Sequence, residues 1–384
     1  MSQWKEVKLG NIASVQTGPF GSQLHNEDYK ESGTPIVTVE HLGNKKFTRQ
    51  NLPRVSQEDC VRLAKYSMKT GDIIFSRVGA VDRCSLVSQE ESGWLFSSRC
   101  LCVRANDEID SEWLYYYFCL DTTKLNVRSI AVGATMPSIN TKILSNDVFV
   151  KYPTSIESQR RIASILSSLD AKIENNNKIN AKLEEIAQNL FKEWFVNFGP
   201  FKDGKFVESE LGLIPEGWRV GTLGEILDIK YGKNHKKLGN GQIPVYGSGG
   251  LMRYANKYLY DQESVLIPRK GTLNNIMYVT EPFWTVDTMF YSEVKIPNSA
   301  IFAYQFLSQK DMNQLNSGTS IPSMTTEILN KQKLSISSEK VMQEYNNIVK
   351  SLYDQIKHNK LEASKLSTLR DTLLPKLMSG EIEV

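Results

Sequence analysis

Two stretches of the chain carry mostly apolar residues at helical spacing over more than four heptads. The first stripe starts at Ile162 and the second at Tyr345, and in both the steps alternate between four and three positions. This spacing is typical of long helices that pack along an apolar seam. The predicted seam positions are Leu166, Leu169, Ile173, Asn176, Leu183 and Leu190 in the first stripe and Leu352, Ile356, Asn359, Leu366 and Leu373 in the second. The first helix should run from about Ser158 to Phe195, or about 57 Å.

Asn176 and Asn359 occupy equivalent positions in these two seams. One interpretation is a buried polar pair, which costs stability but fixes the register of two packed helices. The other is that the segment NNNKIN, residues 175–180, is a hydrated and frayed stretch. The sequence leaves both interpretations open.

The segments that precede the two helices have a different pattern. Short alternating or apolar runs are bounded by Gly, Pro and Asn, which is typical of strands; the runs are TPIVTV (34–39), GDIIFS (71–76), LCVRA (101–105), SVLIP (264–268) and FYSEVKI (290–296). Each segment also carries a helical stretch, SEWLYYYF (111–118) in the first and AIFAYQFL (300–307) in the second. We therefore predict an α+β protein with two mixed α/β units, separated by a long antiparallel two-helix coiled coil.

The two halves of the chain are related by an internal repeat. GATMPSINTKIL at residues 133–144 recurs as GTSIPSMTTEIL at residues 318–329, with six of twelve positions identical. WKEVKLGNI, from Trp4, similarly resembles WRVGTLGEI, from Trp218. The ends of the unit match while its middle diverges, as in a shared scaffold that carries two recognition surfaces, although relaxed selection on surface loops would leave the same pattern. A pseudo-twofold repeat requires antiparallel helices, and B-DNA offers a matching twofold symmetry to proteins that recognise two sites.

These observations divide the chain into four segments. The predicted order is a first recognition domain (1–155), a first long helix (156–198), a second recognition domain (199–340) and a second long helix with the C-terminal tail (341–384). No apolar run is long enough to span a bilayer, and MSQWKEVKLG lacks a signal-peptide core. We therefore expect a cytoplasmic protein that does not contact membranes.

Composition narrows the possible chemistry. The five cysteines include no C-x-x-C pair and the four histidines are scattered, which predicts reduced structural thiols and no metal site. The net charge is only +3 and does not by itself indicate a nucleic-acid-binding protein. There is no P-loop pattern, and no Pro-Pro of the kind that an adenine methyltransferase uses to hold its base. The glycine-rich stretch 239–250 lacks a strand–GxGxxG–helix context, so it predicts turns.

If the twofold repeat serves to bind DNA, the candidates for contact are basic and polar residues in loops. Their hypothetical set is Ser22, Lys45, Lys46, Arg77, Arg83, Lys233, Asn234, His235, Lys236, Lys237, Arg269 and Lys270. Arg77 and Arg269 lie at equivalent places after strand-like runs, where they could contact phosphate or guanine, or could instead pair with a carboxylate that braces the loop. The lysines of 233–237 could equally form a solvated face. Tyr231, Tyr246 and Tyr254 could stack or pack near DNA, but they are rather expected in the core.

The order of the segments resembles the specificity subunit of type I restriction–modification systems. The stretches that carry the resemblance are TGPFGSQL (17–24), the two repeated P-S segments, SQRRIASILSSLDAKIE (158–174), LFKEWF (190–195), GLIPEGWRVGTLGEI (212–226), IPVYGSGG (243–250) and LLPKLMSGEIEV (373–384). The resemblance implies a non-catalytic subunit in which each recognition domain binds half of a split target in double-stranded DNA. It implies that the helices set the spacing and dock two methyltransferase subunits, which restriction subunits then join.

The same resemblance implies that this chain holds no cofactor. S-adenosylmethionine, ATP and Mg²⁺ would be bound by the partner subunits. Two other functions remain open at this point: a self-contained DNA-modifying enzyme, and a coiled-coil scaffold that binds only proteins. Modification or cleavage of DNA by the purified chain would favour the first, and failure to bind DNA even with methyltransferase subunits would favour the second.

Overall fold

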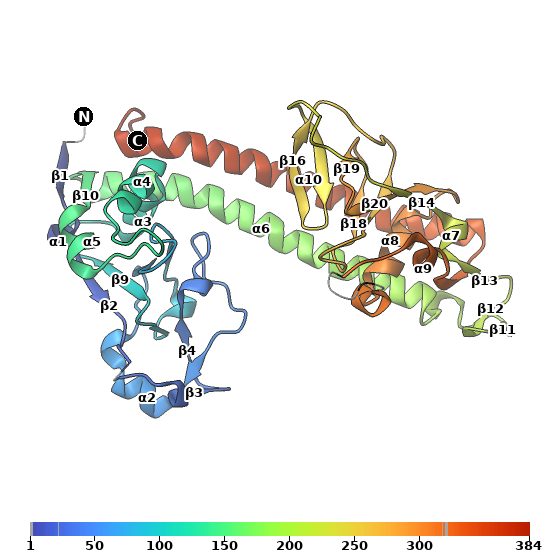
Figure 1. The fold of residues 1–384 in the computed structure, drawn as a ribbon, viewed down its shortest axis with the longest axis horizontal. Helices are drawn as coiled ribbons and strands as arrows, with labels where there is room; N and C mark the ends of the chain where they lie inside the picture. Colours follow the sequence, from blue (N-terminus) through green and yellow to red (C-terminus); the bar gives the residue numbers. More distant parts are fainter. Residues whose placement is uncertain (1–2, 22, 317, 319–321) are drawn as a thin grey trace. The chain divides into compact units, whose positions relative to one another are not determined.

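The computed structural model describes residues 3–21, 23–316, 318 and 322–384. The chain separates into two units: residues 1–174 together with 363–384 form unit 1, and residues 175–362 form unit 2. Two long helices, α6 (Ile156–Phe195) and α10 (Glu339–Ser379), contribute residues to both units. They are the long green and red helices of Figure 1.

Unit 1 is built on an antiparallel four-stranded sheet in the order β2-β9-β6-β7. Its elements before α6 are β1 Trp4–Lys8, α1 Leu9–Ile12, β2 Ala13–Thr17, β3 Tyr29–Lys30, β4 Thr34–Val37, β5 Arg54–Val55, α2 Gln57–Arg62, β6 Ile73–Ser76, β7 Cys84–Leu86, β8 Leu95–Phe96, β9 Cys100–Ala105, α3 Ser111–Cys119, α4 Asp121–Ser129, α5 Thr141–Asp147 and β10 Phe149–Pro153. A second sheet, β3-β5-β4-β8, contains the parallel pair β4–β8, and β1 pairs with β10.

Unit 2 repeats this plan with the sheet β14-β20-β17-β18. Its elements between the long helices are β11 Phe206–Ser209, β12 Gly212–Pro215, β13 Arg219–Thr222, α7 Leu223–Ile226, β14 Leu227–Tyr231, β15 Ile243–Gly247, β16 Gly250–Ala255, β17 Ser264–Pro268, β18 Met277–Val279, β19 Trp284–Thr285, β20 Met289–Val294, α8 Ala300–Ser308, α9 Thr326–Asn330 and β21 Lys333–Ile336. The parallel pair β15–β19 matches β4–β8, and β13–β21 matches β1–β10. The internal repeat of the sequence is thus a repeat of topology.

The apolar strands of each main sheet are buried on both faces, which explains why their sequences do not alternate. Ile73 and Phe75 of β6 point into one core of unit 1, and Ile74 points into another. In unit 2, Val265 and Ile267 of β17 lie in the large core while Leu266 lies in a smaller one. Because successive side chains of a strand face opposite sides, two cores require an uninterrupted apolar run.

The long helices complete the core of each unit and run antiparallel within it. In unit 1, Ile162 and Leu166 near the start of α6 pack in one core with Leu377 near the end of α10. In unit 2, Phe195 near the end of α6 lies 4.8 Å from Tyr345 near the start of α10, measured between ring centres. The predicted seam is therefore also part of each unit's own hydrophobic core.

Every predicted seam position is at least partly buried. Leu166, Asn176, Ile356 and Asn359 are buried, and Leu169, Ile173, Leu183, Leu190, Leu352, Leu366 and Leu373 are half-buried. Asn176 is 1% exposed inside a continuous helix, so the frayed interpretation of residues 175–180 is wrong. The two asparagines do not pair with each other, however: Asn176 donates to Glu362 at 2.7 Å and Asn359 donates to Asn180 at 2.9 Å.

The predicted strands and helices are present, and some of their ends differ from the prediction. The run TPIVTV forms a strand only as far as Val37, because Thr38 caps a 3-10 turn at Val39–His41 through contacts with the His41 ring. The second long helix ends at Ser379 and is followed by a short C-terminal tail. Gly380 begins this tail with a φ of 79°, a conformation that glycine adopts at helix ends without strain.

Candidate nucleic-acid interface

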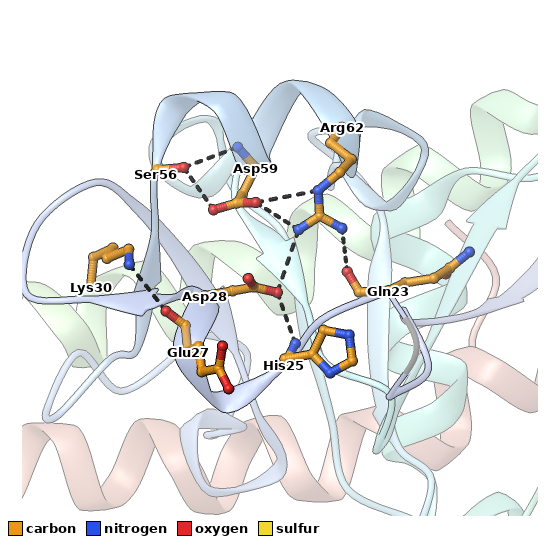
Figure 2. Close-up of polar contacts among 8 residues, drawn as sticks. All are labelled: Gln23, His25, Glu27, Asp28, Lys30, Ser56, Asp59 and Arg62. Carbon is orange, nitrogen blue, oxygen red and sulfur yellow. Dashed lines mark hydrogen bonds and ion pairs between the residues drawn. The ribbon is translucent and has the colours of Figure 1, made fainter.

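The loop that follows β2 in unit 1 is held by an arginine at the end of α2. Arg62 donates from Nη1 to the backbone carbonyl of Gln23 at 2.5 Å, and from Nη2 to the carboxylates of Asp59 at 2.6 Å and Asp28 at 3.4 Å. Figure 2 shows the Arg62 guanidinium between these three partners. The hydrogen bond from Arg62 lowers the pKa of the Asp59 carboxyl, with a second contribution from Ser56. The ionised pair therefore persists at neutral pH and fixes one side of the loop.

The rest of the network in Figure 2 shapes the loop itself. The backbone N–H of His25 donates to Asp28 at 2.8 Å, and the Lys30 ammonium donates to the Glu27 carbonyl at 3.0 Å. Ser56 accepts the backbone N–H of Asp59 at 3.1 Å and so caps helix α2, from which Arg62 projects. The loop consequently has a defined shape although it contains little regular structure.

Unit 2 fixes the corresponding loop, after β14, with a different arginine. Arg253 of β16 donates from Nη2 to the carbonyls of Leu238 at 2.7 Å and His235 at 3.2 Å. The loop is also fastened at Lys233, whose carbonyl accepts the Trp284 indole N–H at 2.9 Å. Residues 233–237, hereafter the lysine loop, thus present their side chains from a braced backbone.

The lysine loop carries exposed positive charge. The side chains of Lys233, Lys236 and Lys237 are exposed and form no ion pair with any residue that the structure describes. Asn234 accepts the backbone N–H of Lys236 at 2.9 Å, and His235 is half-buried. The Asn234 amide therefore shapes the loop, whereas the three ammonium groups are available to a polyanion.

Arg77 and Arg269 occupy equivalent positions, as the repeat predicted, but neither pairs with a carboxylate of a described residue. Each instead donates from Nη1 to a backbone carbonyl, Ser98 at 3.2 Å and Asp287 at 3.0 Å respectively. Each guanidinium also lies over an exposed aromatic ring, that of Phe20 or of Tyr231. The bracing of both arginines is thus provided by backbone and ring, not by an acid.

The other predicted contacts fall into three groups. The Lys45 ammonium donates to Glu112 at 2.7 Å and the Lys46 ammonium to Glu174 at 2.5 Å. Both lysines are therefore paired with carboxylates of unit 1. Arg83 and Lys270 are exposed and make no ion pair with the described part of the chain. Ser22 lies outside the described residues. A role in DNA contact stays a prediction for all five.

Some surface residues were missed or misjudged from the sequence. Tyr231 and Tyr254 are 53% and 51% exposed, so their expected core placement is wrong, whereas Tyr246 is half-buried. Phe20, which is 50% exposed, and the loop-bracing Arg62 and Arg253 carry no sequence signal that separates them from other aromatic or basic residues. Their roles follow only from contacts made across the fold.

The glycine-rich stretch 239–250 forms turns, as predicted, and also a strand that was not predicted. Strand β15 lies within it, and its end is joined to β16 by a tight turn in which Gly250 has a φ of 107°. Within the described ranges no group of three His, Cys, Asp or Glu side chains could hold a metal ion, and no described helix is long and apolar enough to cross a membrane. All five cysteines are free thiols.

Known proteins are similar to this chain in sequence and in fold. The family model for the type I restriction modification DNA specificity domain matches residues 1–185 and 215–367. The chain is 31% identical over 306 residues to the type I restriction enzyme MjaIX specificity subunit of Methanocaldococcus jannaschii, a match that covers 72% of this chain and 70% of that protein. It is 23% identical over 469 residues to the HindI specificity subunit of Haemophilus influenzae, covering 100% of each.

The fold is also that of a solved specificity subunit. The crystal structure of the type I restriction–modification system S subunit from M. genitalium matches 98% of this chain and 96% of its own, with a TM-score of 0.64 at 19% identity. The duplicated α/β units, the two long helices and the family match over most of the chain agree with one another. The chain therefore belongs to the type I restriction–modification specificity subunits, the non-catalytic DNA-recognition components of these systems.

Proposed function

We propose that unit 1 and unit 2 each bind one half of a bipartite, asymmetric target in double-stranded DNA. The observation that carries this proposal is the combination of a duplicated sheet with different loops. The loop after β2 is braced by Arg62 and contains Asp28. The equivalent loop after β14 is braced by Arg253 and carries three lysines that form no ion pair with a described residue. Because base recognition depends on which side chains reach the groove, two different loops predict two different half-sites.

The proposed assembly assigns the remaining tasks to partners. The pair α6 and α10 would set the number of base pairs between the half-sites and dock two methyltransferase subunits, with restriction subunits joining that core in the cytoplasm. S-adenosylmethionine, ATP and Mg²⁺ would be bound by those partners.

The test is to co-express the chain with the methyltransferase subunits of its own system and to sequence the methylated bases of the host DNA. The expected motif has two different half-sites separated by unspecified base pairs, and it disappears when this chain is omitted. A palindromic motif would contradict the proposal that the two units bind different half-sites. Retention of no DNA by the purified methyltransferase complex would favour a protein-only scaffold, and methylation or cleavage by this chain alone would favour a self-contained enzyme.

A further inference from the structure

The structure contains the same arginine–aromatic pair twice. The guanidinium carbon of Arg77, which follows β6, lies 5.5 Å from the centre of the Phe20 ring. That of Arg269, which follows the equivalent strand β17, lies 5.3 Å from the centre of the Tyr231 ring. Tyr231 ends β14 and Phe20 lies just beyond the end of its counterpart β2. Two exposed rings at equivalent strand ends therefore support two equivalent cations.

The backbone on each side of the arginine is held identically in the two units. The N–H of Arg77 donates to Arg99 and the N–H of Arg269 donates to Thr288, both at 2.8 Å. The carbonyl of Arg77 accepts the N–H of Ile139 at 2.9 Å, and that of Arg269 accepts the N–H of Met324 at 2.8 Å. Both arginines are thus fixed in position from two directions.

The twelve-residue repeat supplies one of these two directions. Gly79, two residues after Arg77, donates to the carbonyl of Pro137 at 2.8 Å, and Gly271 donates to that of Pro322 at 3.1 Å. Both glycines have positive φ, 73° and 88°, which lets the loop turn back after the arginine. The arginine loop of each unit is therefore fastened by two residues of the repeat, Pro137 and Ile139 in unit 1 and Pro322 and Met324 in unit 2. This gives a physical reason for the similarity of the repeat at these positions.

Each arginine keeps most of its hydrogen-bonding capacity. A guanidinium has five N–H donors, and the contacts to described residues use one of them, on a backbone carbonyl. The ring beneath it is a cation–π partner and restricts the guanidinium plane without neutralising its charge. Both side chains are half-buried, and the rings below are half exposed. The result is an immobilised positive group with donors still available to an external anion.

A feature common to both units should bind a feature common to both half-sites. The loops differ, so the bases that they contact differ, whereas the sugar–phosphate backbone is the same in any duplex. We propose that Arg77 and Arg269 are equivalent phosphate anchors, and that Phe20 and Tyr231 are positioning residues that orient them. This inference rests on the proposed function and adds which residues bind DNA independently of its sequence.

The test uses the complex of the chain with its methyltransferase subunits, and duplexes with and without the methylated motif. Arg77→Ala and Arg269→Ala should each reduce the slope of log K against log salt by about 0.9, and the double variant by about 1.8. The reduction should be equal for both duplexes, so the ratio of specific to non-specific affinity and the methylated motif stay unchanged. Between about 50 and 200 mM salt, each anchor accounts for about a 3.5-fold change in affinity.

Further variants separate positioning from charge. Phe20→Leu and Tyr231→Leu keep an apolar side chain but remove the ring, so affinity should fall while the salt slope is retained. Arg77→Lys should likewise retain the slope, because the charge remains, and it controls for misfolding of the alanine variant. Arg219→Ala is the matched control. Arg219, an exposed residue of β13, pairs with Glu225 at 2.6 Å, so its loss should leave the slope unchanged.

The outcomes distinguish this proposal from the one on which it rests. If the wild-type complex binds no DNA, the proposed function fails. If the wild type binds but the double variant keeps the parental slope, the phosphate-anchor assignment is wrong. If either alanine variant relaxes the methylated motif at one base position, that arginine reads a base edge, and the assignment is again overturned.

Discussion

Lengthening both long helices by four residues at facing positions should lengthen the spacer of the DNA target. The insertion points are between Glu174 and Asn175 in α6 and between Glu362 and Ala363 in α10, where the two units divide. They face each other, because Asn176 donates to Glu362 at 2.7 Å. A paired insertion therefore leaves the helix contacts inside each unit in their original register.

The expected change follows from helix geometry. Four residues add about 6 Å along the helix axis and a net rotation of about 40°. Two base pairs add about 7 Å along B-DNA and about 70° of twist, so about 30° remains to be absorbed by helix and DNA twist. We expect a motif with both half-sites unchanged and about two more base pairs between them. The assay is sequencing of methylated DNA after co-expression with the methyltransferase subunits.

Two controls make the result interpretable. Insertion into α6 alone lengthens one helix of the pair and not the other. The helix contacts of unit 1 and those of unit 2, such as Asn180–Asn359, then cannot all be kept, so the melting temperature of this variant should fall. A paired two-residue insertion rotates the apolar faces by about 200° and should release the methyltransferase subunits. An active four-residue variant that still methylates the parental spacing would refute the idea that these helices set the spacing.

Three further predictions concern single features of the fold. Changing all three lysines of the lysine loop to alanine should reduce the slope of log K against log salt by about 2.7, which corresponds to about 40-fold in affinity between about 50 and 200 mM salt. The control Lys331→Ala removes a lysine that is already paired with a glutamate, so it should leave the slope unchanged. A triple variant with the wild-type slope would indicate that the three lysines only form a solvated face. Asn176→Leu removes the amide that donates to the Glu362 carboxylate, so we expect a loss of about 1–3 kcal/mol in the free energy of unfolding. An unchanged denaturation midpoint would contradict this prediction. Iodoacetamide at neutral pH should modify the partly exposed Cys60 before the buried Cys100. Burial raises the pKa of Cys100 to about 12, and the thiolate is the reactive form. Early modification of Cys100, detected by mass spectrometry, would show that the buried sheet opens.

The elements with a repeating pattern were predictable from the sequence. Leu166 and Ile356 are buried as the heptad spacing predicted, because helix periodicity alone places them on one face. Arg77 and Arg269 were paired by the internal repeat, and the structure places them in equivalent loops with equivalent backbone contacts. In both cases the information is local or duplicated, so it can be read along one chain.

The fate of individual loop side chains was decided only by the tertiary structure. Lys45 and Lys233 are the same residue type in glycine-containing loops, yet the first is paired with Glu112 and the second with no described acid. Glu112 lies on helix α3, far from Lys45 along the chain, and no periodicity relates the two. Phe20 likewise became a support for Arg77 only because β2 ends beside the loop after β6. Such contacts depend on strand pairing between distant segments, since a side chain's partner is set by spatial neighbours rather than by its own sequence surroundings.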